Sequence, residues 1–410
     1  MKIKKALLLL VALPQILIAQ TDFLSEEIRP LVNFVEQCNT SPVDYIMGLF
    51  DKYDVVVLGE RDHRDMTQYD LIQQIISDPR FIEKVGHIFT EVGGYNWNDE
   101  LNAVLKGTYP DDAVFDKKLA QIIFDIDNFW EKTNYTKLMK DVYLVNKNLP
   151  SEKKISITPT EFSFSWRQVG KMTEQEREKL MTSVRNEIWK KHKDMIMGNN
   201  AITEIYKIFN GNNSRKKVLV IYNTPHSCRY FENQDNRYPY FAYQIIADRF
   251  PGRVANVMVN WAVMSNDSGY SSLSNNGKLD AAFAACGYKS IGFDLEKSPL
   301  GELVFDIEKS LLVSEIKMKD VYHGFIFYKP VHEWVIGIGI PNLEKKVYRD
   351  EFLRRTQIYG NIKGIKKIIF RTVLRNEEFK YYTTVRTLPM NVEFSDAQYN
   401  EQIRRYQSHD

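Results

Sequence analysis

The stretch DVVVLGERDH, from Asp54 to His63, joins a run of valines to a glycine and a group of polar residues. A short β-branched run that ends in glycine is typical of a buried parallel strand leading into a loop. The next segment, MTQYDLIQQIIS from Met66 to Ser77, has apolar residues close to helical spacing. The sequence therefore predicts a strand, a loop and a helix in succession.

Similar short apolar runs recur along the chain and alternate with segments of helical spacing. Five more strands are expected, at HIFTEVGG (87–94), KISITPT (154–160), KKVLVIYN (216–223), RVANVMVN (253–260) and GFIFY (324–328). Helices are expected at 97–105 and within 116–148. Strands that alternate with helices predict an α/β fold with a largely parallel β-sheet covered by helices.

Two charged regions lie outside this alternation. Residues 172–208, between the third and fourth strands, interleave charged and apolar residues. This pattern predicts one or two amphipathic helices, inserted as a candidate lid. Residues 342–410 are rich in Lys, Arg and Tyr. We expect this C-terminal extension to be a helical appendage, with a basic partner surface as the alternative.

The N-terminus is typical of a signal peptide. Lysines precede an apolar run of 13 residues, Ala6 to Ile18, and Ala19 then supplies a small residue. A membrane-spanning helix needs about 20 mostly apolar residues, so we expect no permanent membrane anchor. Residues 1–19 are predicted to be removed on export, to the periplasm or outside the cell, leaving residues 20–341 as one α/β domain.

Charge and cysteine content narrow the choice of partners. The net charge of +2 gives no global reason to expect nucleic acid as a partner. The three cysteines lie at wide spacing and encode neither a disulfide framework nor a C-x-x-C zinc site. We expect a small-molecule or short-peptide substrate.

Proton-transferring side chains follow three of the expected strands. Glu60 and His63 come after the first strand, Glu91 after HIFT, and His226 after VLVIYN. Ligands of an open parallel sheet bind beyond the carboxyl ends of its strands. Two of the chain's seven histidines fall at such ends, so we predict that these four residues share one functional site.

These residue types suit hydrolysis by activated water. Histidine titrates near neutral pH and is a natural general base, and Glu60 or Glu91 could orient the His63 ring. The chain has no G-x-S-x-G elbow, so water is the simpler nucleophile. It also has no H-E-x-x-H motif. No metal is predicted, but His63, Glu91 and His226 are the expected ligands if a divalent metal is bound.

The segment VVVLGERDH, ending at His63, resembles the G-E-x-x-H signature of the erythromycin-esterase-like superfamily. Glu91, which follows a strand 28 residues later, strengthens the resemblance. FWEKTNYTKLMKDVYLVN (129–146) resembles the family's Trp-containing helix. KDMIMGNN (193–200) and VLVIYNTPH (218–226) resemble its R-D-x-x-M-A-x-N helix and its N-x-H strand end. The resemblance covers about residues 51–329.

The resemblance implies a role for each residue of the predicted site. His63 is the expected base that activates water, Glu91 is its carboxylate partner, His226 is a second essential histidine and Glu60 is a supporting acid. Glu161 is the acidic residue expected after the third strand.

The sequence also departs from the family pattern near the first histidine. Asp62 and Arg64 replace the usual threonine and glycine, and Lys193 stands where an arginine is usual. Larger, charged residues beside His63 narrow the pocket, so a macrolide substrate is not expected. Arg61, Arg64 and Lys193 are candidates for meeting negative charge that develops during the reaction.

Proteins of this superfamily hydrolyse macrolide lactones, bind haem in exported iron-uptake lipoproteins, or cleave peptides with a metal. A shared fold therefore leaves the activity open. We expect an exported hydrolase that cleaves an ester or lactone without a cofactor. The alternatives are a haem- or tetrapyrrole-binding protein and a metal-dependent peptidase.

Overall fold

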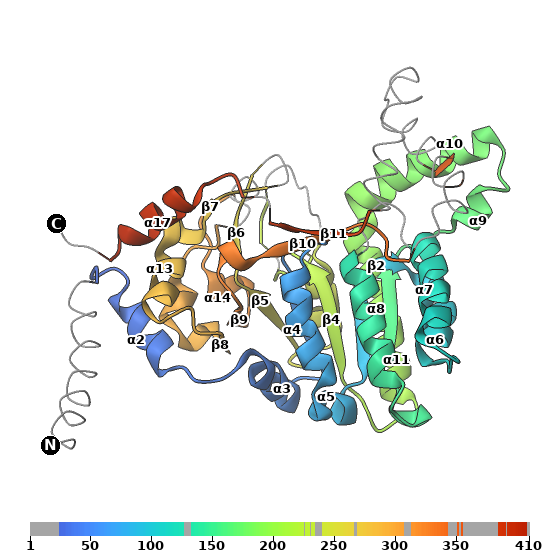
Figure 1. Ribbon diagram of the computed structural model, residues 1–410, viewed down its shortest axis with the longest axis horizontal. Coiled ribbons are helices and arrows are strands. Elements are labelled where there is room, and N and C mark those ends of the chain that lie inside the picture. Colours follow the sequence, from blue (N-terminus) through green and yellow to red (C-terminus); the bar gives the residue numbers. More distant parts are fainter. Residues whose placement is uncertain are drawn as a thin grey trace, which may run out of the picture.

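The computed structural model of the protein is built around a seven-stranded β-sheet (Figure 1). It describes residues 24–126, 133–224, 226–229, 231–233, 240–265, 269–306, 313–342, 351, 354–355, 384–390 and 392–407. The strands of the sheet are β1 (Val55–Glu60), β2 (His87–Gly94), β3 (Ser156–Glu161), β4 (Val218–Asn223), β5 (Val254–Val259), β8 (Ile291–Asp294) and β9 (Gly324–Phe327). Their order across the sheet is β3-β2-β4-β1-β5-β9-β8.

The strand pairs of this sheet are parallel, except that β8 is antiparallel to β9. This arrangement confirms the predicted α/β class with a largely parallel sheet. The six strands expected from the sequence are β1 to β5 and β9. Strand β8 was not expected, because its four residues, IGFD, are a short apolar run at the edge of the sheet.

Different helices cover the two faces of the sheet, because successive residues of a strand point to opposite faces. In β1, Val56 and Leu58 pack on one face, and Val55 and Val57 on the other. The first face is covered by α3 (Pro42–Lys52), α4 (Met66–Ser77), α5 (Pro79–Lys84), α6 (Asn98–Lys106), α7 (Asp112–Ile126) and α8 (Thr133–Asn146). The second is covered by α11 (Lys193–Asn210) and α12 (Ala242–Arg249). Both faces are therefore buried, as the unbroken run of valines in β1 requires.

A further hydrophobic cluster lies at the β9–β8 end of the sheet. Its helices are α2 (Arg29–Gln37), α13 (Lys278–Ala285), α14 (Met318–Val321) and α17 (Asp396–Arg404). A small antiparallel pair, β6 (Ala262–Met264) and β7 (Tyr270–Leu273), adjoins it. Short helical turns are η1 (Tyr95–Trp97), η2 (Ser151–Lys153), α9 (Trp166–Val169), η5 (Ser274–Gly277), η6 (Leu295–Lys297), η7 (Pro299–Glu302) and η9 (Val331–Glu333).

The region predicted as a helical insertion, 172–208, is helical but serves two purposes. It contains α10 (Glu174–Ser183), a π-helical segment η3 (Val184–His192) and most of α11. Helix α10 projects from the body of the molecule (Figure 1). Helix α11 instead buries Met197, Ala201 and Ile205 against the sheet. The part of the candidate lid from Lys193 onward is therefore a core helix, whose apolar residues recur every fourth position.

The C-terminal extension, 342–410, returns to the body of the protein in the parts that the structure describes. Strand β11 (Arg386–Pro389) pairs antiparallel with β10 (Val335–Ile338). Helix α17 packs against α13. The extension thus supplies the expected helix and also a strand that was not expected, because all four residues of β11 are exposed and form no apolar run.

The predicted signal peptide, residues 1–19, lies outside the described residues. Within the described part of the chain, none of the helices combines the length and the apolar character needed to cross a bilayer.

Candidate active site

Four neighbouring strands, β3, β2, β4 and β1, bring their carboxyl ends to one edge of the sheet. Glu60 is the last residue of β1, Glu91 lies in β2, and Asn223 ends β4. His63 and His226 follow β1 and β4 in the next loops. The predicted site residues therefore meet at this edge because parallel strands end together there.

A β-bulge in β2 sets the position of Glu91. The register against β3 shifts between Thr90 and Gly94. Within this bulge Gly93 has φ of +107°, and a Cβ atom there would lie 3.0 Å from the Pro159 Cβ. Only glycine fits this conformation without strain. A bulge at a strand end is a common way to re-aim a side chain next to a site.

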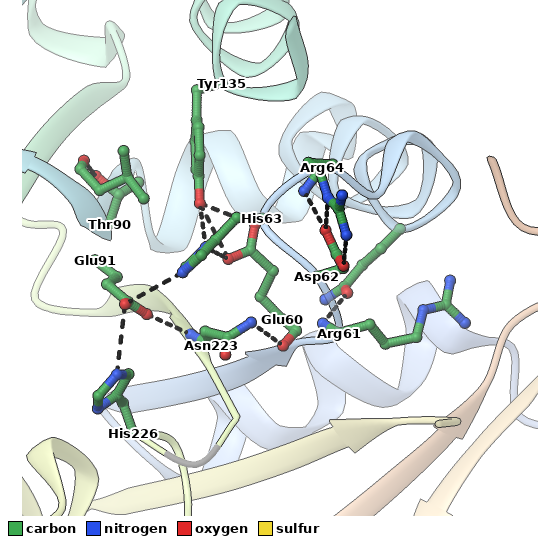
Figure 2. A network of polar contacts seen from close by, with 12 residues as sticks. Glu60, Arg61, Asp62, His63, Arg64, Thr90, Glu91, Tyr135, Asn223 and His226 are labelled. Atoms are coloured by element: carbon green, nitrogen blue, oxygen red, sulfur yellow. Dashed lines mark hydrogen bonds and ion pairs between the residues drawn. The ribbon is translucent and has the colours of Figure 1, made fainter. Parts of the chain in front are cut away.

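The His63 ring is held from both of its nitrogens (Figure 2). Its Nδ1 lies 2.7 Å from Glu60 Oε2 and 2.8 Å from the Tyr135 hydroxyl. The Tyr69 hydroxyl donates to Glu60 Oε1 at 2.8 Å, so the carboxylate behind the ring is itself fixed. The His63 Nε2 lies 3.4 Å from Glu91 Oε1. The ring therefore turns Nδ1 toward the protein interior and Nε2 toward Glu91.

One oxygen of Glu91 is the common contact of three basic side chains. Glu91 Oε1 lies 2.7 Å from Lys193 Nζ, 3.4 Å from His63 Nε2 and 3.5 Å from His226 Nε2. Its other oxygen, Oε2, accepts a hydrogen bond from the Asn223 backbone N–H at 2.8 Å. Glu91 is thus the centre of the cluster.

His226 is oriented by a carboxylate of its own. Its Nδ1 lies 2.8 Å from Asp194 Oδ1, in the first turn of α11. The same Oδ1 accepts the Ala242 backbone N–H at 2.8 Å. A carboxylate at Nδ1 fixes the ring orientation and favours a proton there, which leaves Nε2 facing Glu91.

Lys193, the first residue of α11, reaches two carboxylates. Besides Glu91, its Nζ lies 3.6 Å from Glu161 Oε1, at the end of β3. Burial opposes the charged amine, but the attraction of Glu91 and Glu161 outweighs it and raises the pKa of Lys193. The amine therefore stays a cation at neutral pH.

The charges around Glu91 shift the pKa of each partner. Burial opposes ionisation of Glu91, but Lys193, His226 and His63 outweigh it and hold the pKa of Glu91 well below its usual range. Burial also opposes a charged His63 ring, yet Glu91 and Glu60 raise the pKa of His63 well above its usual value. The pKa of His226 is raised against burial by Asp194 and Glu91, whereas burial raises the pKa of Glu60. Groups with opposed shifts in one cluster are typical of acid–base sites.

The two glutamates and the basic side chains of the cluster differ in the exposed fraction of their side chains. The side chains of Glu60 and Glu91 are both 1% exposed. The side chains of His63, Lys193 and His226 are 13%, 11% and 10% exposed. The basic side chains are therefore slightly more exposed than these two carboxylates, while Asp194, at 8%, is close to its partner His226.

The structure pairs the two arginines near His63 with aspartates of their own loop. The buried Arg61 guanidinium lies 2.7 Å from Asp65 Oδ2 and 4.0 Å from the centre of the Trp334 ring. Arg64 forms a two-pronged pair with Asp62 at 2.8 Å. Both were predicted to meet developing charge. Arg61 holds the loop in place, because its guanidinium lies buried between Asp65 and Trp334.

The cluster also offers a group of potential metal ligands. One atom each from Glu60, His63 and Glu91 lies within 4.8 Å of the others. Two carboxylates and one imidazole suit a zinc or manganese ion. This set differs from the one expected from the sequence, because Glu60 takes the place of His226.

Three residues of the cluster were not predicted. Asp194 lies in KDMIMGNN, directly after Lys193, and its place in that segment was the one available signal. Tyr69 and Tyr135 contact Glu60 from α4 and α8. Tyr135 lies in the segment 129–146, which resembles the family's Trp-containing helix, whereas Tyr69 has the helical spacing typical of a core residue.

No known protein-family model matches the sequence, and no curated protein does. Similar solved structures include three that cover 69–74% of this chain. One is a mutant of the erythromycin esterase EreC in its open conformation, with 10% identity and a TM-score of 0.46 over 74% of this chain and 96% of that one. The second is a protein from Bacillus cereus, with 11% identity and a TM-score of 0.44 over 72% of this chain and 96% of that one. The third is a succinoglycan biosynthesis protein, with 10% identity and a TM-score of 0.46 over 69% of this chain and 89% of that one. Erythromycin esterase is the family that the sequence motifs resemble. At this identity the likeness concerns the fold alone, so the residue roles below rest on the geometry of this chain.

Proposed function

We propose that this protein is an exported hydrolase that cleaves an ester or lactone with water activated by His63. The observation that carries the proposal is the fixed orientation of the His63 ring. Glu60 and Tyr135 hold Nδ1, and Nε2 faces the partly exposed cluster around Glu91. A histidine oriented at one nitrogen by a carboxylate, with the other nitrogen toward the cleft, is the arrangement that general-base catalysis uses.

The proposed reaction needs only water and the side chains of the cluster. His63 Nε2 takes a proton from water as the water oxygen bonds to the carbonyl carbon. Lys193 and His226 stabilise the negative charge that forms on the carbonyl oxygen. The carbon–oxygen bond to the leaving group then breaks, and His63 returns its proton to the departing alkoxide. The products are a carboxylic acid and an alcohol.

The pH dependence of the rate follows from the raised pKa of His63. The base form of His63 appears only as pH rises through that pKa, which lies well above 6.5. Hydrolysis should therefore increase with pH into the alkaline range. Removing the negative charge of Glu91 lowers the pKa of His63, so Glu91→Gln should move the acidic limb of the pH–rate profile to lower pH. A limb that stays in place, or moves to higher pH, would contradict the assignment of His63 as base.

The activity test compares two histidines of the same chain. Purified protein is screened against chromogenic esters and lactones, and the best substrate is assayed with His63→Ala and His332→Ala. His332 lies on the surface in η9. We expect His63→Ala to lower kcat/KM by a factor of about 10² to 10⁴, and His332→Ala to leave it unchanged. Equal rates for the two variants would refute the proposal.

A metal-assisted version of the reaction is the second candidate, favoured by the ligand group of Glu60, His63 and Glu91. A bound divalent ion would polarise the carbonyl and lower the pKa of water. Lys193 contacts the same Glu91 oxygen at 2.7 Å, so a cation there would compete with the amine. Elemental analysis and chelator treatment separate the versions. Full activity of chelated, metal-free protein supports base catalysis alone, whereas loss that zinc or manganese restores supports the metal.

Export is part of the proposal and rests on the N-terminal sequence. Lysines, an apolar run and a small residue at 1–19 have the features of a removable signal. Expression of the full chain, followed by fractionation and N-terminal sequencing, tests it. A cytoplasmic protein that retains residue 1 would contradict export.

A further inference from the structure

The cluster holds two basic groups besides His63, and in the proposed hydrolysis both meet the negative charge on the carbonyl oxygen. His63, Lys193 and His226 all lie within 3.5 Å of Glu91 Oε1. Each pair of the three nitrogens is therefore separated by at most twice that distance. If His63 acts as the base, Lys193 and His226 remain as two cationic groups beside the reacting bond. A transient oxyanion is commonly met by neutral N–H donors.

The exposure of these side chains indicates what kind of ligand the cluster binds. His63, Lys193 and His226 are the partly exposed members of the cluster, at 10–13%. Glu91 and Glu161 lie beneath them at 1% and 2%. A ligand that reaches the cluster therefore meets the side chains of these basic residues before the two glutamates.

Neighbouring carboxylates hold the basic groups in place. Asp194 Oδ1 lies 2.8 Å from His226 Nδ1, and Glu161 Oε1 lies 3.6 Å from Lys193 Nζ. Of these two acids, Glu161 is the more deeply buried at 2% exposed, whereas Asp194 is 8% exposed. Arg61 does not take this role, because its side chain is fully buried against Asp65, and Arg64 forms a two-pronged pair with Asp62 in the adjoining loop.

We propose that the ester or lactone cleaved at this site carries a permanent negative charge, a carboxylate or phosphate, close to the scissile bond, and that Lys193 and His226 bind it. This inference rests on the proposed hydrolase function and adds the substrate class. A fixed anion beside a partly buried lysine gains a charge-assisted hydrogen bond. A neutral or cationic ester of the same shape gains none.

The test uses two esters that share the scissile bond and the leaving group. One is the 4-nitrophenyl monoester of glutarate, which ends in a carboxylate. The other is the 4-nitrophenyl ester of 5-methylhexanoate, in which an isopropyl group replaces that carboxylate. The ratio of their kcat/KM values cancels effects of a variant on the chemical step. We expect the anionic ester to be preferred at least about tenfold, and the preference to fall as salt is added.

Two substitutions of one residue provide the variant and its control. Lys193→Met should bring the ratio to within about threefold of one, whereas Lys193→Arg keeps the positive charge and should retain the preference. A wild-type ratio at or below one, or the same ratio in Lys193→Met as in the wild type, would overturn the proposed substrate class.

An equilibrium measurement separates this inference from the hydrolase proposal. Glutarate is titrated into wild type, Lys193→Met and Lys193→Arg by calorimetry. Binding that Lys193→Met weakens at least tenfold supports the anion site even if neither ester is hydrolysed, in which case the hydrolase proposal alone fails. His63-dependent hydrolysis without a charge preference, and without glutarate binding, refutes the anion site and leaves the hydrolase proposal standing.

Discussion

Replacing Glu91 by glutamine should destabilise the protein strongly, because three basic groups depend on this carboxylate. Lys193 Nζ lies 2.7 Å from Glu91 Oε1, and both side chains are largely buried. At an effective dielectric constant of about 20, a unit charge pair at this distance attracts by about 6 kcal/mol. Glutamine avoids the desolvation of a buried carboxylate, so the net loss is smaller. Breaking one side of a buried pair typically costs about 3–5 kcal/mol, and we expect a value in that range.

Urea unfolding at pH 7, followed by tryptophan fluorescence, measures this loss, with the m-value checked for constancy. A double-mutant cycle with Lys193→Met identifies its source. The double variant has neither charge and so contains no unpaired ammonium. Its free energy of unfolding should be about 1–3 kcal/mol higher than the value obtained by adding the losses of the two single variants. Glu91→Asp is the matched control that retains the charge.

The pH dependence of the loss has a definite sign. The pKa of Glu91 is lowered in the folded protein, so its contribution is present above the ordinary glutamate pKa of 4.5 and is lost as pH falls through the lowered value. The stability difference between wild type and Glu91→Gln should therefore shrink in acid. A Glu91→Gln variant within about 0.5 kcal/mol of wild type at pH 7, with no coupling to Lys193, would refute the role of Glu91 as the central counter-charge.

Three further predictions concern the loop of Arg61, the start of β2 and the bulge at Gly93. Arg61→Met leaves the buried Asp65 without its ion-pair partner, so urea unfolding should show a free energy of unfolding about 3–5 kcal/mol lower. Adding Asp65→Asn should recover part of that loss. Equal stability of wild type, single variant and double variant would contradict the buried pair. Burial and nearby cations lower the pKa of His87 to about 4. The free energy of unfolding of the wild type should therefore fall by up to about 3 kcal/mol as pH falls from 6.5 toward 4. The His87→Gln variant should lose less stability over that range. Gly93→Ala places a side chain at a residue with positive φ, which should lower the free energy of unfolding by about 1–3 kcal/mol. It should also lower the rate of ester hydrolysis by displacing Glu91. Unchanged stability and rate would show that the bulge is not needed.

The sequence predicted the centre of the sheet well because each central strand is a compact apolar run. VVVL and VLVIY are buried on both faces, so they needed no alternation to be recognised. The convergence of Glu60, His63, Glu91 and His226 followed from the same assignment, since parallel strands end at one edge.

The remaining features depend on contacts between residues far apart in the sequence. Asp194 reaches His226 across 32 residues, and Tyr135 reaches His63 across 72. Neither contact leaves a local pattern. Arg61 stands two residues from His63 and was a candidate for meeting developing charge, and its guanidinium turns to Asp65 and Trp334. Adjacency in a loop does not determine the direction of a side chain.

The strand pair β10–β11 determines when the site can be completed during synthesis. In β10, Ile336 bridges to Asp65, and the Gly337 N–H donates to the Arg64 carbonyl at 2.8 Å. The loop that carries His63 is therefore braced by residues from the last fifth of the chain, and β11 pairs with that brace from further still. A growing chain folds its N-terminal elements first. A ribosome-bound or C-terminally clipped chain would carry every residue of the cluster and still lack this support, so the loop would reach its final arrangement only after the last segment has folded back.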